Sequence, residues 1–496
     1  MNEISPIRTD RHPSESYEDI LGRDTRPVPD YLRQGPVRDL GDEGVPASNY
    51  FDPEHFAKEV RHVWLKVWQW ACRDEDIPEP GDVFVYENVG KSIIVTRQRD
   101  GSVKAFYNSC LHRGRKLVDH CGTRPEFRCK FHGLAWNCDG TFKDNPIAWD
   151  FPQFKTRDMR LPEVRVESWG GFIFINFDPA AKPLMHYIQP LADHFDRFDF
   201  ANRYKAAHIS KVMACNWKVA TEAFMESHHA FVTHPQLALF LGDVNSQYDI
   251  LSDHVTRQFT ATAVVSPMFA DRNIDELGIL KAMAEAGGSH VSGGQSDKGG
   301  ITTQVTNARS RPAAPMSLDE GITARIYAAD VTRKSLSAED GWDYSAVSDA
   351  EMLDALLYNV FPHMSFWAGF APNVIYRWRP NGLDPNSSIM DIIILKRVPK
   401  DGPRPKPIEE QRLGPDQRFT ESSQLGALGP VFEQDMGNLP EVQEGLKTSG
   451  TGVVNFARYQ EMRIRLLHKL IADMIAEGGA YTRTGVAAPP TRRACH

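Results

Sequence analysis

Long apolar runs are absent from this 496-residue sequence. The longest apolar stretches, such as residues 392–395, are far shorter than the roughly 18 residues that a membrane-spanning helix needs. Residues 1–49 are polar and rich in Asp, Arg and Pro, without the basic and then apolar order of a signal peptide. These absences argue against a role in a membrane and predict a cytoplasmic protein.

An excess of positive charge is also missing. The formal net charge is −8, and the Lys and Arg residues are scattered along the chain. Proteins that bind nucleic acid or anionic membrane surfaces carry clustered Lys and Arg, which contact the phosphate groups. The charge pattern therefore predicts neither kind of partner.

Binding motifs for redox nucleotides are lacking as well. No G-x-G-x-x-G fingerprint follows a predicted strand, and the sequence has no second cysteine cluster. We therefore expect neither a flavin site nor a nicotinamide site. Any redox reaction would need electrons from a separate protein.

Cysteine is scarce and unevenly distributed. Four of the seven cysteines lie between positions 110 and 138. In a reducing compartment, such a group binds metal or performs chemistry more often than it forms disulfides, although spacing alone permits a disulfide between Cys121 and Cys138. The seven are Cys72, Cys110, Cys121, Cys129, Cys138, Cys215 and Cys495.

The length of the chain predicts two packed units after a polar N-terminal arm at 1–49. From 50 to 178, a helix that opens at Pro53 precedes short segments rich in β-branched and aromatic residues, which is typical of a small all-β unit. We expect its strands at 82–86, 92–96, 103–107 and 172–177.

From 179 to 496, the pattern mixes helices with long strands. Helices are expected at 217–234 and 456–476, and strands at 373–378 and 388–397, which together indicate an α+β unit with an antiparallel sheet. Two other segments are rich in Gly and Ser or in Pro and charged residues, and we expect flexible loops there. These segments are 287–315 and 399–417.

Two Cys-His pairs, Cys110-x-His112 and Cys129-x-x-His132, form the first candidate site. Because strand side chains repeat every two residues, Cys-x-His places both ligands on one side of a hairpin tip. Two such tips could clamp a binuclear iron–sulfur cluster, with both thiolates on one iron and both imidazoles on the other. A structural zinc site is the alternative, since two Cys and two His are also a zinc ligand set.

The second candidate site lies in residues 216–235, N-W-K-V-A-T-E-A-F-M-E-S-H-H-A-F-V-T-H-P. On a helix, Glu222, Glu226 and His229 would share one face. His234 would lie about 140° farther round, so both imidazoles reach one metal only if the helix ends or unwinds between them. Two His ligands and one carboxylate form the facial triad of non-haem Fe(II) oxygenases.

The order C-x-H-R-G followed by C-x-x-H-G, in a β-rich surround, resembles the Rieske non-haem iron oxygenases, the aromatic-ring-hydroxylating alpha-subunit family. The resemblance implies a small all-β Rieske [2Fe-2S] domain followed by a larger helix-grip (START-like) catalytic domain. It also implies that the cluster is bound by Cys110, His112, Cys129 and His132.

The N-W-K start and the H-x₄-H spacing resemble the catalytic-iron motif of the same family. This resemblance implies a mononuclear Fe(II) that is bound by His229, His234 and a distant carboxylate. The segment F-E-Q-D-M-G-N-L-P-E-V-Q-E-G-L resembles the family's third-ligand segment and indicates Asp435, with Glu433 and Glu441 as weaker alternatives.

The resemblance also assigns roles to three neighbours of these ligands. Glu226 stands where the family has the carboxylate that links the Rieske centre of one subunit to the iron of the next. Asn216, in the N-W-K start, is predicted to be catalytic. His228 replaces a common Tyr and is interpreted as a supporting or core residue rather than a ligand.

Two positions depart from the family pattern. Phe131 replaces the usual Tyr before the second cluster His, and Leu134 replaces the usual Trp after the following Gly. Loss of the Tyr hydroxyl would remove a hydrogen bond near the cluster and shift its reduction potential.

The resemblance implies the terminal oxygenase component of a multicomponent system. It would hydroxylate a hydrophobic, aromatic or polycyclic substrate with O₂, and NAD(P)H would act only through a ferredoxin or flavin reductase. A homotrimer, with or without a beta subunit, is expected. O- or N-demethylation, a Rieske electron-transfer protein without catalytic iron and a zinc-stabilised binding module remain alternatives.

Side chains near both sites suggest what the sites contact. Arg113, Arg115 and Lys116 beside the cluster could attract an acidic partner or form a solvated basic loop. Four apolar residues near the second site predict either an apolar pocket or ordinary core packing. These residues are Phe224, Phe231, Leu237 and Phe240.

Overall fold

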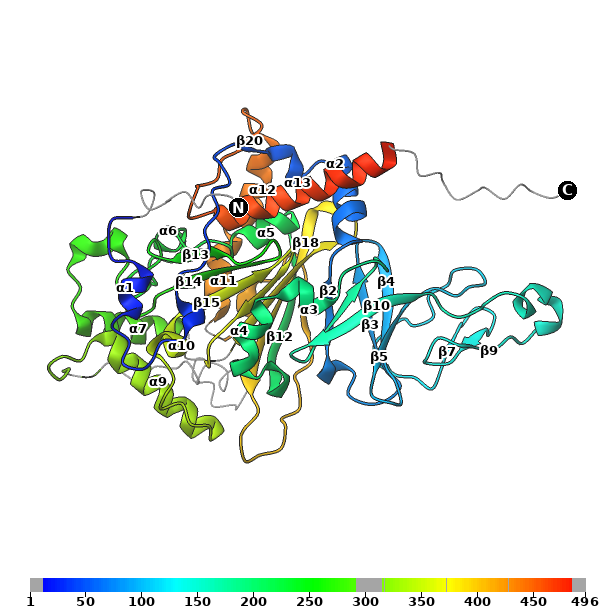
Figure 1. Ribbon diagram of the computed structural model, residues 1–496, viewed down its shortest axis with the longest axis horizontal. Helices are drawn as coiled ribbons and strands as arrows, with labels where there is room; N and C mark the ends of the chain where they lie inside the picture. Colours follow the sequence, from blue (N-terminus) through cyan, green and yellow to red (C-terminus); the bar gives the residue numbers. More distant parts are fainter. Residues whose placement is uncertain (1–11, 291–314, 316, 372, 427, 484–496) are drawn as a thin grey trace.

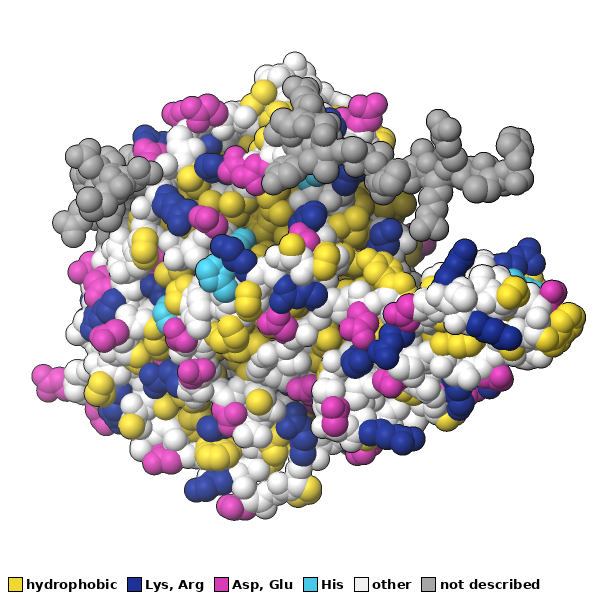
Figure 2. Space-filling model, turned by 45° about the vertical axis from the view of Figure 1, so that its right-hand side comes forward, with side chains coloured by type: hydrophobic (Ala, Val, Ile, Leu, Met, Phe, Trp, Pro, Cys, Tyr) yellow, Lys and Arg dark blue, Asp and Glu magenta, His cyan; other side chains and the backbone are white. Residues whose placement is uncertain are grey.

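The computed structural model describes residues 12–290, 315, 317–371, 373–426 and 428–483. A smaller unit of strands projects from a larger body of sheet and helices (Figures 1 and 2). Most of the predicted loop at 287–315 lies outside the described residues, but its first residues, 287–290, end a helix.

The smaller unit contains an antiparallel seven-stranded sheet in the order β2-β11-β10-β5-β4-β3-β6 and a three-stranded sheet, β7-β8-β9. In β4, Ile93 and Val95 pack into one apolar cluster, and Ile94 packs into another. Both faces of the strand are therefore covered, which explains its continuous apolar run. The strands are β2 Gln69–Arg73, β3 Asp82–Asn88, β4 Lys91–Arg97, β5 Val103–Tyr107, β6 Gly122–Thr123, β7 Phe127–Arg128, β8 Ala135–Trp136, β9 Phe142–Asp144, β10 Glu163–Trp169 and β11 Phe172–Asn176.

The larger body is built on an eight-stranded sheet in the order β13-β14-β15-β16-β17-β18-β12-β19. Its neighbours pair antiparallel, except that β19 pairs parallel with β12. The strand β19 lies within 399–417, so this segment is not a loop throughout. The strands are β12 Arg203–Met213, β13 Gln247–Ile250, β14 Val255–Thr260, β15 Ala355–Val360, β16 Met364–Trp367, β17 Asn373–Asn381, β18 Asp384–Arg397 and β19 Gln411–Leu413.

Helices surround this sheet, and the long helix α13 runs across one side of it (Figure 1). The mixture confirms the predicted α+β architecture. Within the described ranges, no helix combines the length and apolar character needed to span a bilayer. The helices are α2 Pro53–Glu59, α3 Leu184–Ile188, α4 Leu191–Phe195, α5 Trp217–Glu222, α6 Ala230–Thr233, α7 Glu276–His290, α9 Ala324–Asp340, α10 Asp349–Leu353, α11 Leu428–Met436, α12 Leu439–Lys447 and α13 Met462–Arg483.

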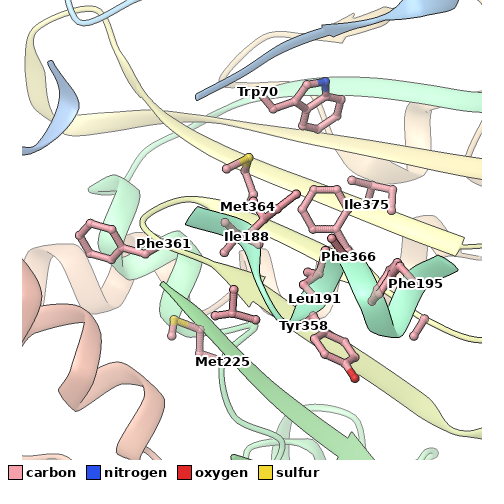
Figure 3. Close-up of a cluster of buried hydrophobic side chains, with 14 of the residues drawn as sticks. Trp70, Ile188, Leu191, Phe195, Met225, Tyr358, Phe361, Met364, Phe366 and Ile375 are labelled. Atoms are coloured by element: carbon pink, nitrogen blue, oxygen red, sulfur yellow. The ribbon is translucent and has the colours of Figure 1, made fainter. Parts of the chain in front are cut away.

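One hydrophobic core joins the two units (Figure 3). Phe172 of the smaller unit packs edge-on against Trp70 of the same sheet and against Phe366 of the larger body, with ring centroids 5.1 and 5.2 Å away. Arg377 of β17 donates to the backbone oxygens of Trp70 and Ala71, at 2.6 and 3.0 Å. These contacts fix the smaller unit against the body.

The described part of the N-terminal arm, residues 12–49, packs onto the larger body. Its short helix α1 (Tyr17–Leu21) is buried on one side, and the Tyr17 hydroxyl donates to Asp354 at 2.9 Å. Strand β1 (Val45–Pro46) pairs antiparallel with β20 (Val453–Val454) near the other end of the described chain. The polar composition of the arm therefore reflects ion pairs and hydrogen bonds made at the surface of the body.

A buried ion pair connects α2 to α5. Glu59 and Lys218 are both fully buried, and Nζ of Lys218 lies 2.5 Å from Oε1 of Glu59. The indole N–H of Trp217 donates to the other carboxylate oxygen at 3.0 Å. This pair anchors the helix that leads into the second candidate site.

Replacing Lys218 with alanine is expected to lower the free energy of unfolding by about 3–5 kcal/mol, because it leaves the Glu59 carboxylate buried without its cation. Denaturant unfolding followed by tryptophan fluorescence measures the change. Lys58→Ala, at an exposed position of α2, is the control and should change stability by less than about 0.5 kcal/mol. A loss below about 1 kcal/mol for Lys218→Ala would contradict a structural role for the pair.

Candidate metal centres and substrate cavity

Two loops of the same shape carry the cysteines of the first candidate site. Cys110 follows β5, and Cys129 follows β7. The N–H of Gly114 donates to the oxygen of Cys110 at 2.9 Å, and the N–H of Gly133 donates to the oxygen of Cys129 at 3.0 Å. Both glycines have φ of 79°, a backbone conformation that other residues rarely adopt. The glycine of each motif therefore closes its loop.

These loops bring four donor side chains to the tip of the smaller unit. The Cys110 and Cys129 thiols are buried, and the rings of His112 and His132 lie 4.7 Å apart. Nδ1 of each imidazole is buried and, among the described residues, has no hydrogen-bond partner. Such unpaired buried groups are costly. The donor set therefore fits a bound metal centre, either an iron–sulfur cluster or zinc.

The two departures from the family pattern lie in different surroundings. Phe131 is 55% exposed, and the guanidinium of Arg113 lies over its ring at 5.1 Å. Leu134 is fully buried in the core below the loops. The other two basic residues are engaged in surface ion pairs, Arg115 with Asp119 and Lys116 with Glu87.

The predicted helix at 217–234 is interrupted. It consists of α5, a non-helical stretch at 223–229 and the short α6. Ser227 explains the break, because its N–H donates to the Tyr248 hydroxyl at 3.1 Å and its hydroxyl donates to the oxygen of Asp243 at 2.7 Å. Glu222, Glu226 and His229 consequently do not share a helical face.

His229 and His234 flank α6 and meet Asp435 from α11. Nε2 of His234 lies 3.0 Å from Oδ1 of Asp435, and Nε2 of His229 lies 3.9 Å from the same oxygen. One ligand atom from each residue lies within 4.8 Å of the other two. Two imidazoles and one carboxylate in this arrangement fit a mononuclear metal ion with open coordination positions.

Two side chains orient the imidazoles. Oε1 of Glu226 lies 2.5 Å from Nδ1 of His229, and Oε1 of Gln434 lies 2.8 Å from Nδ1 of His234. Both Nε2 atoms are thereby left for a metal ion. Sequence reasoning missed Gln434, although its position next to Asp435 in the third-ligand segment was an available signal.

Glu226 contacts both histidines of its segment. Its second oxygen lies 2.8 Å from Nδ1 of His228, whose side chain is 37% exposed. Burial acts to raise the pKa of Glu226, but His229 and His228 outweigh it and lower the pKa to about 2. The carboxylate is therefore ionised and connects two partly exposed imidazoles, 28% exposed in His229 and 37% in His228.

Three other residues that the sequence suggested for catalysis or as the third ligand, Asn216, Glu433 and Glu441, lie outside the triad. The side chain of Asn216 caps α5, accepting from the Lys218 N–H at 2.9 Å, and donates to the oxygen of Pro385 at 2.7 Å. Asn216 does not line the cavity beside the triad, and its contacts are those of a helix cap. Glu433 accepts from the backbone of another loop, and Glu441 is exposed on α12.

A third group of donors, His208, Asp391 and Glu410, also lies close together. Asp391 accepts from Arg377 at 2.8 Å and from Arg379 at 3.3 Å. Burial acts to raise the pKa of Asp391, but the two guanidinium groups outweigh it and hold the pKa well below its usual range. They supply the positive charge that a cation would otherwise bring, and we interpret this group as an ion-pair cluster.

A cavity of about 260 Å³ lies beside the triad, between the sheet and the segments that carry the three ligands. A cavity of roughly 150 Å³ can hold benzene, so this one has room for a ring compound. Of the four predicted pocket residues, only Phe231 is missing from the wall. Apolar side chains predominate among Ala223, Phe224, Ala230, Leu237, Phe240, Leu241, Leu353, Ala355, Leu357, Trp367, Val374, Tyr376, Ile394, Leu428, Val431 and Phe432.

Comparison with protein families identifies both units. Residues 195–477, more than half of the chain, match the model of the ring hydroxylating alpha subunit (catalytic domain). The chain belongs to the ring hydroxylating alpha subunit family. Residues 67–155 match the Rieske [2Fe-2S] domain, which decides between the cluster and zinc for the first site. The predicted cofactors, a [2Fe-2S] cluster and a mononuclear iron, are those of this family.

Curated members of the family include both dioxygenases and monooxygenases. The chain is 33% identical over 197 residues to the large oxygenase component of the 2,4-dinitrotoluene dioxygenase system of Burkholderia sp. (strain RASC), covering 38% of this chain and 44% of that protein. It is 29% identical over 194 residues to the carnitine monooxygenase oxygenase subunit of Escherichia coli (strain K12), covering 38% and 52%. The aligned part thus spans about half of these relatives' lengths.

Solved structures of family members share the fold. A quaternary ammonium Rieske monooxygenase superposes with a TM-score of 0.60 at 16% identity, covering 88% of this chain and 96% of that chain. A naphthalene 1,2-dioxygenase from Rhodococcus sp. superposes with a TM-score of 0.57 at 18% identity, covering 88% and 95%. The predicted fold, a Rieske domain followed by a helix-and-sheet catalytic domain, is confirmed.

Proposed function

We propose that this protein is the terminal oxygenase of a multicomponent Rieske system and acts on a hydrophobic ring compound. The observation that carries the proposal is the apolar cavity that borders His229, His234 and Asp435. In this proposal, Cys110 and Cys129 with His112 and His132 bind the [2Fe-2S] cluster. The three residues at the cavity would bind Fe(II), which would supply oxygen activation there.

The protein's own groups would position the ligands and exclude water. Glu226 and Gln434 hold Nδ1 of the two imidazoles, so that Nε2 of each faces Asp435. Met225, beside Glu226, lies in the hydrophobic core near Tyr358 and Phe361 and anchors the segment that carries these ligands (Figure 3). The apolar wall would keep bulk water from the reacting carbon.

Monooxygenation, including O- or N-demethylation, is the second candidate. Phe224 lies 4.9 Å from Tyr376 and 6.4 Å from Phe432 by ring centroid, and aromatic rings of this kind can also attract a quaternary ammonium group. The carboxylates that line the cavity, Glu226 and Asp435, already contact histidines. The described wall therefore offers no carboxylate free to pair with a cation, which favours a neutral ring compound.

Electron delivery would involve other chains. In Figure 1, α6 and the strands β7 and β9 lie on opposite sides of the molecule. This separation supports a homotrimer in which Glu226, through His228 at the surface, faces the cluster of a neighbouring subunit. A ferredoxin or flavin reductase would supply the electrons, and the exposed Phe131 with Arg113 over it marks one face where such a donor could contact the Rieske domain.

Metal analysis tests the proposal. We expect about three irons per chain, since the cluster holds two and the triad holds one, together with visible absorption and the electron-spin signal of a reduced Rieske centre. About two irons per chain would instead indicate an electron-transfer protein, and a colourless zinc protein would contradict both. Incorporation of ¹⁸O from labelled O₂ into products from a panel of ring compounds then separates dioxygenation from monooxygenation.

A further inference from the structure

The cavity wall carries a polar stripe on strand β14. Gln258 and Thr260, with Thr262 just beyond the strand, line the cavity and are all buried. Alternate residues of a strand project to the same face, so the three side chains form one row. Besides this row, the triad and Glu226, the other polar side-chain atoms of the wall belong to Ser227, Trp367 and Tyr376, and the remaining lining side chains are apolar. The stripe is therefore a run of polar side chains in the wall that is not part of the metal site.

Arg463 fixes the orientation of the Gln258 amide. The Arg463 side chain is fully buried, and its Nη1 donates to Oε1 of Gln258 at 2.8 Å. Its other nitrogens donate to Thr256 and Asn359. A guanidinium has only donors, so the amide oxygen must face Arg463 and the NH₂ group must face away from it. If the amide were reversed, its NH₂ donors would face the N–H donors of Arg463.

One N–H of Gln258 is occupied, and a second remains. Nε2 donates to Oγ1 of Thr260 at 3.3 Å, and the Thr260 hydroxyl lies 2.5 Å from the hydroxyl of Ser246. No further acceptor for Nε2 occurs among the residues that the structure describes. A buried donor without an acceptor destabilises the empty site, and a ligand that brings an acceptor removes this penalty.

We propose, on the basis of the proposed function, that Gln258 is a specificity-determining residue that donates a hydrogen bond to the substrate. The substrate class is then a neutral ring compound that bears an oxygen acceptor, such as a carbonyl, ether or hydroxyl group, away from the carbon that is oxidised. An anionic acceptor fits less well, because Arg463, the buried cation that contacts the stripe, donates to Gln258 and does not line the cavity.

A matched pair of probes tests this inference. 1-Indanone and indane share one bicyclic skeleton, and only the first has a carbonyl acceptor. Their dissociation constants are measured anaerobically, without an electron donor, by equilibrium dialysis against the full-length, iron-loaded protein. The two probes differ in hydrophobicity. The quantity compared is therefore the ratio of the indanone dissociation constant to the indane dissociation constant, in each variant and in the wild type.

Gln258→Leu should shift this ratio about tenfold toward indane, since a neutral hydrogen bond is worth about that factor. Gln258→Glu keeps the shape of the side chain but presents acceptors, and it should weaken indanone binding at least as much. Thr262→Val, the control on the same row, should leave the ratio within about twofold. Circular dichroism checks that each variant is folded.

The outcomes separate this inference from the proposed function. Tight binding of both probes with an unchanged ratio in both Gln258 variants would overturn the role of Gln258 and leave the oxygenase proposal intact. A shift at Thr262→Val equal to that at Gln258→Leu would assign recognition to the row rather than to Gln258 and would also overturn it. If the wild-type protein binds neither probe, the inference is overturned. Metal analysis and labelled-oxygen products would then still test the proposed function.

Discussion

Replacing Asp435 with alanine is expected to remove the mononuclear iron and abolish turnover while the Rieske spectrum stays intact. The Asp435 carboxylate lies near Nε2 of both imidazoles, with Oδ1 at 3.0 Å from Nε2 of His234 and 3.9 Å from Nε2 of His229. Without it, two neutral imidazoles remain, and the ion loses the only negative ligand of the triad. The cluster lies in the other unit and should not change.

Iron content and product formation measure this effect. Iron should fall from about three to about two per chain, and product formation should fall more than about a hundredfold, because even outer-shell substitutions cost 10–100-fold. Glu441→Ala, an exposed carboxylate of the neighbouring helix, should keep both iron and activity. Activity retained in Asp435→Ala would show that another residue is the third ligand, and Glu433 would then be the first to test.

Replacing Cys110 with serine is expected to have the converse effect, loss of the [2Fe-2S] cluster with retention of the mononuclear iron. The Cys110 thiol is buried between the two loops, and serine offers a harder, less acidic oxygen to an iron–sulfur cluster. Iron should fall to about one per chain, and the visible absorption should disappear. Turnover driven by reductase should be abolished, because the mononuclear site no longer receives electrons.

Cys121→Ser is the matched control for this variant. Cys121 is a free, exposed cysteine eleven positions further along the same unit, and its loss should leave cluster absorption and turnover unchanged. Cluster absorption retained in Cys110→Ser would contradict the assignment of the ligand. Loss of cluster absorption in Cys121→Ser would show instead that the unit is too fragile for the experiment to report on ligation.

The features that the sequence predicted well depend on local patterns. The strand predicted at 103–107 has the observed bounds of β5, and those predicted at 82–86 and 92–96 lie within β3 and β4. The alternation of apolar and polar residues in these strands, or their continuous burial, follows from consecutive residues of the sequence. The Cys-His spacing was equally informative, because the glycine-closed loops around Cys110 and Cys129 are local structures whose geometry follows from a few neighbouring residues.

The features that the sequence could not predict depend on distant contacts. The break at 223–229 follows from hydrogen bonds of Ser227 to Tyr248 and Asp243, which come from other parts of the fold. Asn216 matched a motif but serves as a helix cap. The fixed amide of Gln258 depends on Arg463, 205 positions away. Spacing within one segment carries no information about such partners.

The packing of the N-terminal arm also sets an order for folding during synthesis. The strands and ligand loops of the Rieske unit lie between residues 69 and 176, so this unit can form once those residues have been made. The arm precedes them, but Tyr17 donates a hydrogen bond to Asp354, 337 positions later in the chain. Strand β1 likewise can pair only after β20 has been made. Long-range closures of this kind are slow to form. The residues 17–46 that leave the ribosome early are thus among the last to reach their final places.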